Sequence, residues 1–259
     1  MAINRWSREQ LIVAFALYCQ TSFGKMHKSN PEIVRTAKLV GRTPSSLAMK
    51  LVNFASLDPA ITKTGRKGLG NASVEDKKVW DEFHANWEQL ALQSAKVAGT
   101  LSADTADAEF YESEDKTVEI ESYEAGGKRA WVEVRTKQSF FRRAVISSYK
   151  ARCCMSGLDV PLLLIASHIV PWKVDRFNRL NPRNGLCLSA LHDRAFDKGL
   201  ITVTTDLRIK VSKVLKNSEP EKFLTSSLVS LDGKDLLLPE KFFPDPEFLA
   251  YHVKSIFKG

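Results

Sequence analysis

The stretch from Leu162 to Gly199 decides the fold of the second half of the chain. It reads LLLIASHIVPW (162–172), KVDRFNRLNPR (173–183) and NGLCLSALHDRAFDKG (184–199). The first run is apolar and ends in His168, which is typical of a strand. After a loop rich in Arg and Asn, a second short apolar run begins at Asn184. Ser189 suits the N-cap of a helix, and Gly199 suits the position just after its end. The order is therefore strand, loop, strand and helix, with a His, an Asn and a His in sequence.

These residues resemble the HNH endonuclease family, the ββα-metal nucleases, and in particular a bacterial branch with Ala-x-His-Ile-x-Pro-Trp and Phe-Asp-x-Gly. The resemblance runs from about Arg135 to the C-terminus and includes the segments 138–143 and 153–157. It implies metal-dependent hydrolysis of DNA phosphodiester bonds. By analogy alone, it also implies a role in restriction or defence, with modified DNA as one target class.

The resemblance assigns a role to each letter of the motif. Hydrolysis needs a base that activates water near neutral pH, and a cation that stabilises the developing charge. His168 is the general base that the family pattern implies. Asn184 would hold the loop and orient that histidine, and His192 fills the third letter.

The metal ligands are expected on the helix. Asp193 and Asp197 are one turn apart and share a face, whereas His192 lies about 100° round. Asp197 is the first choice, and the sequence leaves His192 and Asp193 as equal alternatives. Ser167 stands where relatives often place an Asp or His ligand. Carboxylates and one imidazole favour Mg²⁺ or Mn²⁺.

A structural zinc is not expected. Many relatives carry two Cys-x-x-Cys pairs, and this chain has Cys153 with Ser156 and Ser189 with His192 at the corresponding spacing. One thiol among four positions cannot build that site. Cys153 and Cys187 are therefore predicted to be small core residues.

The N-terminal block is predicted to be helical. Ser7 and Gln10 have capping-box spacing, a second helix is expected over 31–40, and a third from Thr43 with Pro44 at its first position. The last two resemble a helix-turn-helix that contacts duplex DNA. The alternative is a plain three-helix bundle with a solvated polar face. The candidate DNA contacts are Arg42, Ser46, Lys50, Asn53, Lys63, Arg66, Lys67, Arg142 and Arg143.

The sequence indicates an α+β protein with a helical domain over 1–97, an acidic linker over 98–127 and a nuclease domain over 128–259. One long helix is expected over 73–96, a strand over 131–135 and a helix over 140–149. Strands over 200–211 and a terminal helix from Pro246 extend the nuclease core.

Charge divides the chain in the same way. The net charge is +8, with +8 in residues 1–70, −10 in 71–127 and +10 in 128–259. Basic blocks attract the phosphate backbone, and an acidic spacer is repelled by it.

The bulk composition is that of a soluble globular protein, with 44% hydrophobic and 26% charged residues. No apolar run of membrane-spanning length and no leader occur, so a cytoplasmic protein with reduced cysteines is expected. Two rival functions stay open, a DNA-binding regulator with a decayed nuclease core and a nuclease for RNA or single strands. The sequence also leaves open a homodimer.

Overall fold

The computed structural model describes residues 5–62, 65, 70–99, 127–217 and 221–259, without the side chains of 127–131. The chain forms two compact units, Met1–Ala144 and Val145–Gly259. The boundary lies inside the helix α7 (Gly127–Ser148). Helices make up the described first unit, and the second combines helices with small antiparallel sheets. The predicted α+β class is confirmed.

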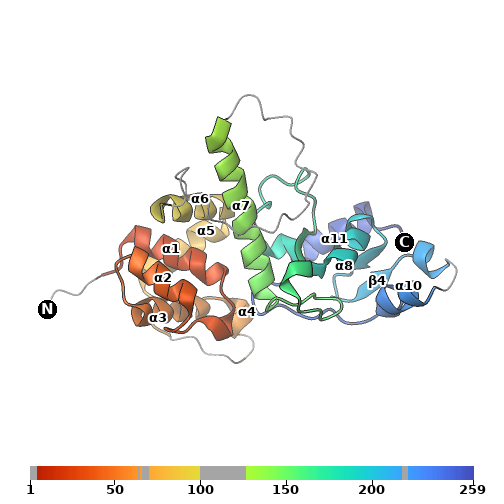
Figure 1. Ribbon diagram of the computed structural model, residues 1–259, viewed down its shortest axis with the longest axis horizontal. Coiled ribbons are helices and arrows are strands. Elements are labelled where there is room, and N and C mark those ends of the chain that lie inside the picture. Colours follow the sequence, from red (N-terminus) through yellow and green to blue (C-terminus); the bar gives the residue numbers. More distant parts are fainter. Residues whose placement is uncertain (1–4, 63–64, 66–69, 100–126, 218–220) are drawn as a thin grey trace. The chain divides into compact units, whose positions relative to one another are not determined.

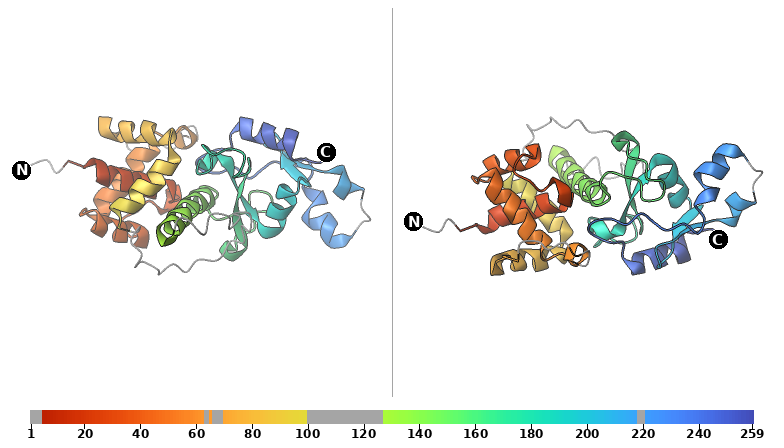
Figure 2. Two further views of the ribbon diagram at one scale, coloured as in Figure 1. Left: turned by 90° about the horizontal axis from the view of Figure 1, so that it is seen from above. Right: turned by 90° about the horizontal axis from the view of Figure 1, so that it is seen from below.

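The first unit is a cluster of helices, drawn in red to yellow in Figures 1 and 2. Its central helix α1 contacts α3, α5 and α6, and every residue from Leu11 to Cys19 is buried. Phe15 and Tyr18 of α1 contact the rings of Phe54 and Trp80 in the core. The helices before α7 are α1 (Arg8–Cys19), α2 (Pro31–Leu39), α3 (Pro44–Ala55), α4 (Pro59–Thr62), α5 (Val74–His84) and α6 (Trp87–Val97).

Local sequence signals set the ends of the first helices. Ser7 and Gln10 form the predicted capping box of α1. Gly41 has a φ of +66° after α2, a conformation in which side chains other than glycine are strained. The Thr43 side chain accepts a hydrogen bond from the amide of Ser46 and caps α3. The predicted helix-turn-helix-like pair is therefore present as α2 and α3, which contact one another.

Two predictions about this region are wrong. The expected single helix over 73–96 is two helices, α5 and α6, because Asn86 caps a new helix through a hydrogen bond from the amide of Gln89. The expected strand over 131–135 is part of α7. Its five-residue alternation is outweighed by the helical spacing that follows, where Phe140, Phe141 and Ala144 are buried. The predicted linker lies almost wholly outside the described residues. No helix in the described ranges has both the length and the apolar character to cross a membrane.

The second unit is built on two hairpins, drawn in teal and blue in Figure 1. Strands β1 (Leu164–His168) and β2 (Gly185–Ser189) pair antiparallel, with His168 opposite Gly185. Helix α8 (Ala190–Asp197) contacts β1, β2 and β3. The predicted later strands and terminal helix are confirmed as β3 (Ile201–Val203), β4 (Ile209–Val211) and α11 (Pro246–Ser255). The short helices α9 (Lys213–Lys216) and α10 (Lys222–Ser227) lie between β4 and α11 in the chain.

Gly199 lets the C-terminal segment close on the end of α8. Its φ is +69°, and a Cβ there would lie 2.1 Å from the carbonyl oxygen of Ile256. The amide of Lys258 donates a hydrogen bond to the Gly199 carbonyl oxygen at 2.9 Å. Any other residue would push this segment away. The glycine therefore both ends the helix and allows the C-terminal segment to pack against it.

His252 fixes α11 against this core. Its ring stacks on Phe196 with centroids 3.7 Å apart. Nε2 lies 3.2 Å from the Phe196 carbonyl oxygen, and Nδ1 lies 2.8 Å from the Thr202 hydroxyl. Burial lowers the pKa of His252 to about 4. The imidazole is therefore neutral at physiological pH, donating from Nε2 and accepting at Nδ1.

Candidate active site on the ββα element

His168 ends β1 and is half-buried. Its Nε2 lies 2.9 Å from the carbonyl oxygen of Arg179. A carbonyl oxygen only accepts hydrogen bonds, so Nε2 must carry the proton of the neutral ring. Nδ1 then holds the lone pair and is the nitrogen that can take a proton from water. The Trp172 ring meets the imidazole edge-on, with centroids 5.5 Å apart.

Asn184 holds the two ends of the loop between β1 and β2. It is fully buried, and its side-chain oxygen accepts a hydrogen bond from the Val170 amide at 2.8 Å. Its amide nitrogen donates to the carbonyl oxygens of Val170 at 3.1 Å and Asn178 at 3.2 Å. Its own carbonyl oxygen accepts from the Ile169 amide at 3.0 Å. These bonds fix the backbone that directly follows His168 and tie it to the loop at Asn178.

Arg179 also fastens the loop from inside. Its Nε donates to the carbonyl oxygen of Trp172 at 2.7 Å. Its guanidinium lies over the Trp172 ring, 5.0 Å from the centroid. The carbonyl group that orients His168 therefore belongs to a residue whose side chain is itself held in place.

Asp193 and Asp197 lie on the outer part of α8, Asp193 half-buried and Asp197 exposed. They are one turn apart and so share a face of the helix. Ser189 begins this helix by accepting a hydrogen bond from the His192 amide. Because α8 contacts both strands of the hairpin, the two carboxylates and His168 belong to one compact ββα element.

His192, the third letter of the motif, occupies a different environment. It is 4% exposed. Its Nδ1 lies 3.3 Å from Cys153 Sγ and 2.9 Å from Ser189 Oγ. Its Nε2 lies 3.0 Å from the Ser227 carbonyl oxygen. Both ring nitrogens are thus engaged inside the unit, an arrangement that disfavours His192 as a metal ligand or catalytic group.

Cys153 and His192 form a buried hydrogen-bonded pair. Burial raises the pKa of the Cys153 thiol, but the hydrogen bonds from His192, Ser156 and the Met155 amide lower it to about 6. Burial lowers the pKa of His192, but the contacts with Cys153 and the Ser227 carbonyl oxygen raise it above its ordinary value. The two pKa values move in opposite directions, as expected for an acid and a base that stabilise one another's charged forms.

Sequence reasoning missed this pair, although a signal was present. Cys153 and Cys187 are buried, as predicted, but Cys153 also contacts the His192 ring. The spacing of Cys153 with Ser156 and of Ser189 with His192, noted only to reject a zinc site, marks four residues that meet here.

The donors on α8 suit a hard divalent cation. Among the described residues no group of three or more His, Cys, Asp or Glu side chains could hold a metal ion. Mg²⁺ needs no such cage, because it usually keeps several waters and binds one or two carboxylates together with substrate phosphates. Ser167, beside His168, is 3% exposed, and its hydroxyl has no hydrogen-bond partner. Two carboxylates fit Mg²⁺ or Mn²⁺ rather than tightly held zinc.

The structure corrects part of the predicted DNA-contact set on the first unit. Lys50 was expected to point outward, but its Nζ lies 2.8 and 2.9 Å from the carboxylate oxygens of Asp76, with both side chains buried. Arg42 donates to Gln10 Oε1 at 2.8 and 3.1 Å and lies over the Trp6 ring. Lys50 is thus absent from the surface, and the Arg42 guanidinium is held by the protein.

The other predicted contacts differ in their surroundings. Ser46 and Asn53 on α3 are half-buried, as is Arg142 on α7. Arg143 is exposed and forms an ion pair with Glu32 at 2.8 Å. Lys63, Arg66 and Lys67 lie outside the described residues.

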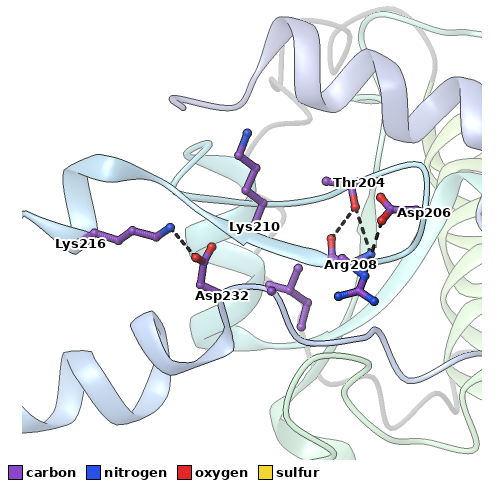
Figure 3. A pocket seen from close by; sticks show the side chains of 8 residues that line it. Thr204, Asp206, Arg208, Lys210, Lys216 and Asp232 are labelled. Carbon is purple, nitrogen blue, oxygen red and sulfur yellow. Dashed lines mark hydrogen bonds and ion pairs between the residues drawn. The ribbon is translucent and has the colours of Figure 1, made fainter.

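A hollow of about 270 Å³ lies at the β3–β4 hairpin (Figure 3). None of its lining residues belongs to the predicted site. Lys216 is paired with Asp232, and Arg208 lies 3.6 Å from Asp206. These carboxylates offset the charge of two cations that would otherwise attract an anion, so the hollow is not part of the candidate active site. It is lined by Thr204, Asp206, Arg208, Ile209, Lys210, Lys216, Asp232 and Gly233.

Comparison with known proteins agrees with this geometry. Residues 153–204 match the family model of the HNH endonucleases, and no curated protein matches the chain. The match begins at Cys153 and covers β1, the loop, β2, α8 and β3. The second unit of this chain therefore contains an HNH endonuclease domain.

Proposed function

We propose that this protein is a divalent-metal-dependent endonuclease that hydrolyses phosphodiester bonds of duplex DNA. The observation that carries the proposal is the hydrogen bond from His168 Nε2 to the Arg179 carbonyl oxygen, 2.9 Å long. It makes Nδ1 the basic nitrogen of a histidine at the end of β1, in the element that also presents two carboxylates.

His168 acts as the general base. Nδ1 accepts a proton from the water that attacks phosphorus, and a base in this role contributes about 10²- to 10⁴-fold to the rate. Asn184 and Arg179 act through His168, because they hold the loop and the carbonyl group that fix its tautomer. They are positioning residues.

Asp193 and Asp197 would hold the metal ion, whose positive charge would stabilise the phosphate in the transition state and the leaving oxygen. The geometry of α8 favours Asp193 over His192 as the partner of Asp197, because His192 faces the interior and uses both ring nitrogens there. The Cys153–His192 pair serves the stability of the domain.

The first unit contributes DNA affinity. Residues 1–70 carry a net charge of +8, and α2 and α3 form a helix-turn-helix-like pair. Ser46 and Asn53 stay as candidate base contacts, with Arg142 and Arg143 as candidate phosphate contacts. A truncated protein that begins at Lys128 should bind duplex DNA more weakly, with a shallower dependence on salt. Equal affinity and slope would assign the helical unit another task.

A role in restriction or defence, including the recognition of modified DNA, is supported only by family likeness. Digestion of modified and unmodified plasmids by the purified protein tests this role and the activity together. The expected result is nicking or linearisation of duplex DNA with added Mg²⁺ or Mn²⁺, and none in excess EDTA. Parallel digests of single-stranded DNA and RNA distinguish the duplex nuclease from its rivals. Tight DNA binding without cleavage under any metal would favour the regulator.

A further inference from the structure

Phe177 is the most exposed of the large apolar side chains described. It is 96% exposed and lies in the loop between β1 and β2. The loop is ordered around it. Asp175 Oδ1 accepts hydrogen bonds from the amides of Phe177 at 3.0 Å and Asn178 at 3.1 Å. Asp175 Oδ2 accepts from the side-chain amide of Asn178 at 2.7 Å. The phenyl ring is thus held out into solvent by a fixed backbone.

The same loop is strongly basic. Between Pro171 and Asn184 it carries four cations, Lys173, Arg176, Arg179 and Arg183, against one carboxylate of its own, Asp175, while Arg183 forms an ion pair at 3.0 Å with Asp245 outside the loop. Lys173 and Arg176, on either side of the Asp175 turn, are exposed. An exposed aromatic ring between exposed cations suits a polyanion that also offers flat apolar faces, which describes a nucleic acid. An apolar protein groove would gain little from these cations.

Phe177 is also tied to the candidate general base. The carbonyl group of Arg179, two residues further on, accepts the hydrogen bond from His168 Nε2, and Asn184 binds the carbonyl oxygen of Asn178 between them. Two residues of chain span at most about 7 Å. A DNA strand with its phosphate at His168 would therefore have neighbouring bases within reach of the ring.

We propose that Phe177 inserts its ring between stacked bases of duplex DNA beside the cleaved phosphate, and so positions the strand for His168. The inference rests on the proposed DNA substrate. Apolar wedges of this kind partly unstack a base step and bend the duplex. Asp175 and Asn178 would keep the loop from folding the ring back before DNA binds.

The test compares Phe177 with Phe223, a second exposed phenylalanine of the same unit, 62% exposed on α10. Binding of a labelled duplex is measured in EDTA, where no cleavage is expected. F177A should weaken binding by about 5- to 150-fold, the range for loss of one base–aromatic stack, and F223A should leave binding unchanged. In F177W the added tryptophan emission should be quenched by duplex DNA, while in F223W it should not.

Cleavage provides a second readout that a purely structural role would not produce. F177A should cut a fully paired duplex more slowly than the parent, and much of the deficit should disappear on duplexes with mismatches, whose bases are already unstacked. Parent-like binding and cleavage by F177A, or unquenched emission from F177W, would overturn the proposal that Phe177 inserts between bases. Either result would leave the nuclease assignment intact. A parent that binds duplex DNA without cutting it contradicts the proposed function, while the binding comparison still decides the role of Phe177. A parent that binds no duplex DNA refutes both.

Discussion

Replacing His192 with alanine separates a stabilising role from a metal-binding one. The imidazole contacts Cys153 Sγ at 3.3 Å and the Ser227 carbonyl oxygen at 3.0 Å. Cys153 is 0% exposed, so the substitution leaves its thiol and the Ser227 carbonyl group without a hydrogen-bond partner and opens a cavity in place of the ring. Loss of a buried ring together with its hydrogen bonds costs about 3–5 kcal/mol. H192A should therefore destabilise the second unit by several kcal/mol.

Hydrogen exchange of the α8 amides, read by mass spectrometry, reports this loss within the intact chain. Each 1.4 kcal/mol is tenfold in an equilibrium constant, so α8 should exchange about 150- to 5,000-fold faster in H192A. D193N, one residue along, is the control and should keep parent-like protection. The double variant C153V/H192L should recover part of the loss, because it refills the cavity and removes the thiol that lacks a partner.

The outcome that refutes the reasoning is specific. If H192A keeps the protection of the parent but raises the metal concentration needed for cleavage, His192 is a ligand, and the buried pair does not stabilise the domain.

Three further predictions follow from individual contacts. D197N and D193N should each raise the Mg²⁺ concentration needed for half-maximal cleavage, or abolish turnover, without loss of folding; an unchanged metal titration in either variant removes that residue from the ligand set. His252 has a pKa of about 4 in the folded chain against an ordinary 6.5, so its share of stability is complete above pH 6.5 and declines as the pH falls toward 4. Between pH 7 and 4.5 the parent should lose about 2–3 kcal/mol more unfolding free energy than H252Q in urea titrations, and equal losses would show that His252 does not titrate as described. K50A should destabilise the first unit by about 3–5 kcal/mol, because it leaves Asp76 buried and unpaired; a stable K50A with weakened DNA binding would restore Lys50 as a DNA contact.

Most of the fold could be predicted because its signals are local. The Ser7 capping box, Pro44 after Thr43 and the glycine after α8 each act within a turn of the residues they affect. The prediction of a strand over 131–135 was wrong, because an alternation of five residues is too short to distinguish a strand from a helix. The longer helical pattern that follows it determines the structure there. The split between α5 and α6 depends on one cap, Asn86, inside an apolar pattern that runs through both.

The candidate site was predictable as a motif but not as an arrangement of contacts. His168, Asn184 and Asp197 stand at fixed spacing, and the hydrogen bonds of Asn184 follow from the loop between the two strands. His192 and Lys50 are different, because their partners lie far along the chain. Cys153 is 39 residues from His192, and Asp76 is 26 residues from Lys50. A helical pattern places a side chain on a face, but tertiary packing determines what that face meets.

The central claim is that His168 removes the proton from the attacking water. Its most direct test is the single-turnover rate of plasmid cleavage at saturating Mg²⁺ or Mn²⁺ for the parent and H168A, with H27A as control because His27 is exposed on the first unit. H168A should lose about 10²- to 10⁴-fold in rate, while duplex binding and the hydrogen exchange of β1 stay as in the parent, and H27A should cut at the parent rate. Cleavage by H168A at the rate of the parent would contradict the account.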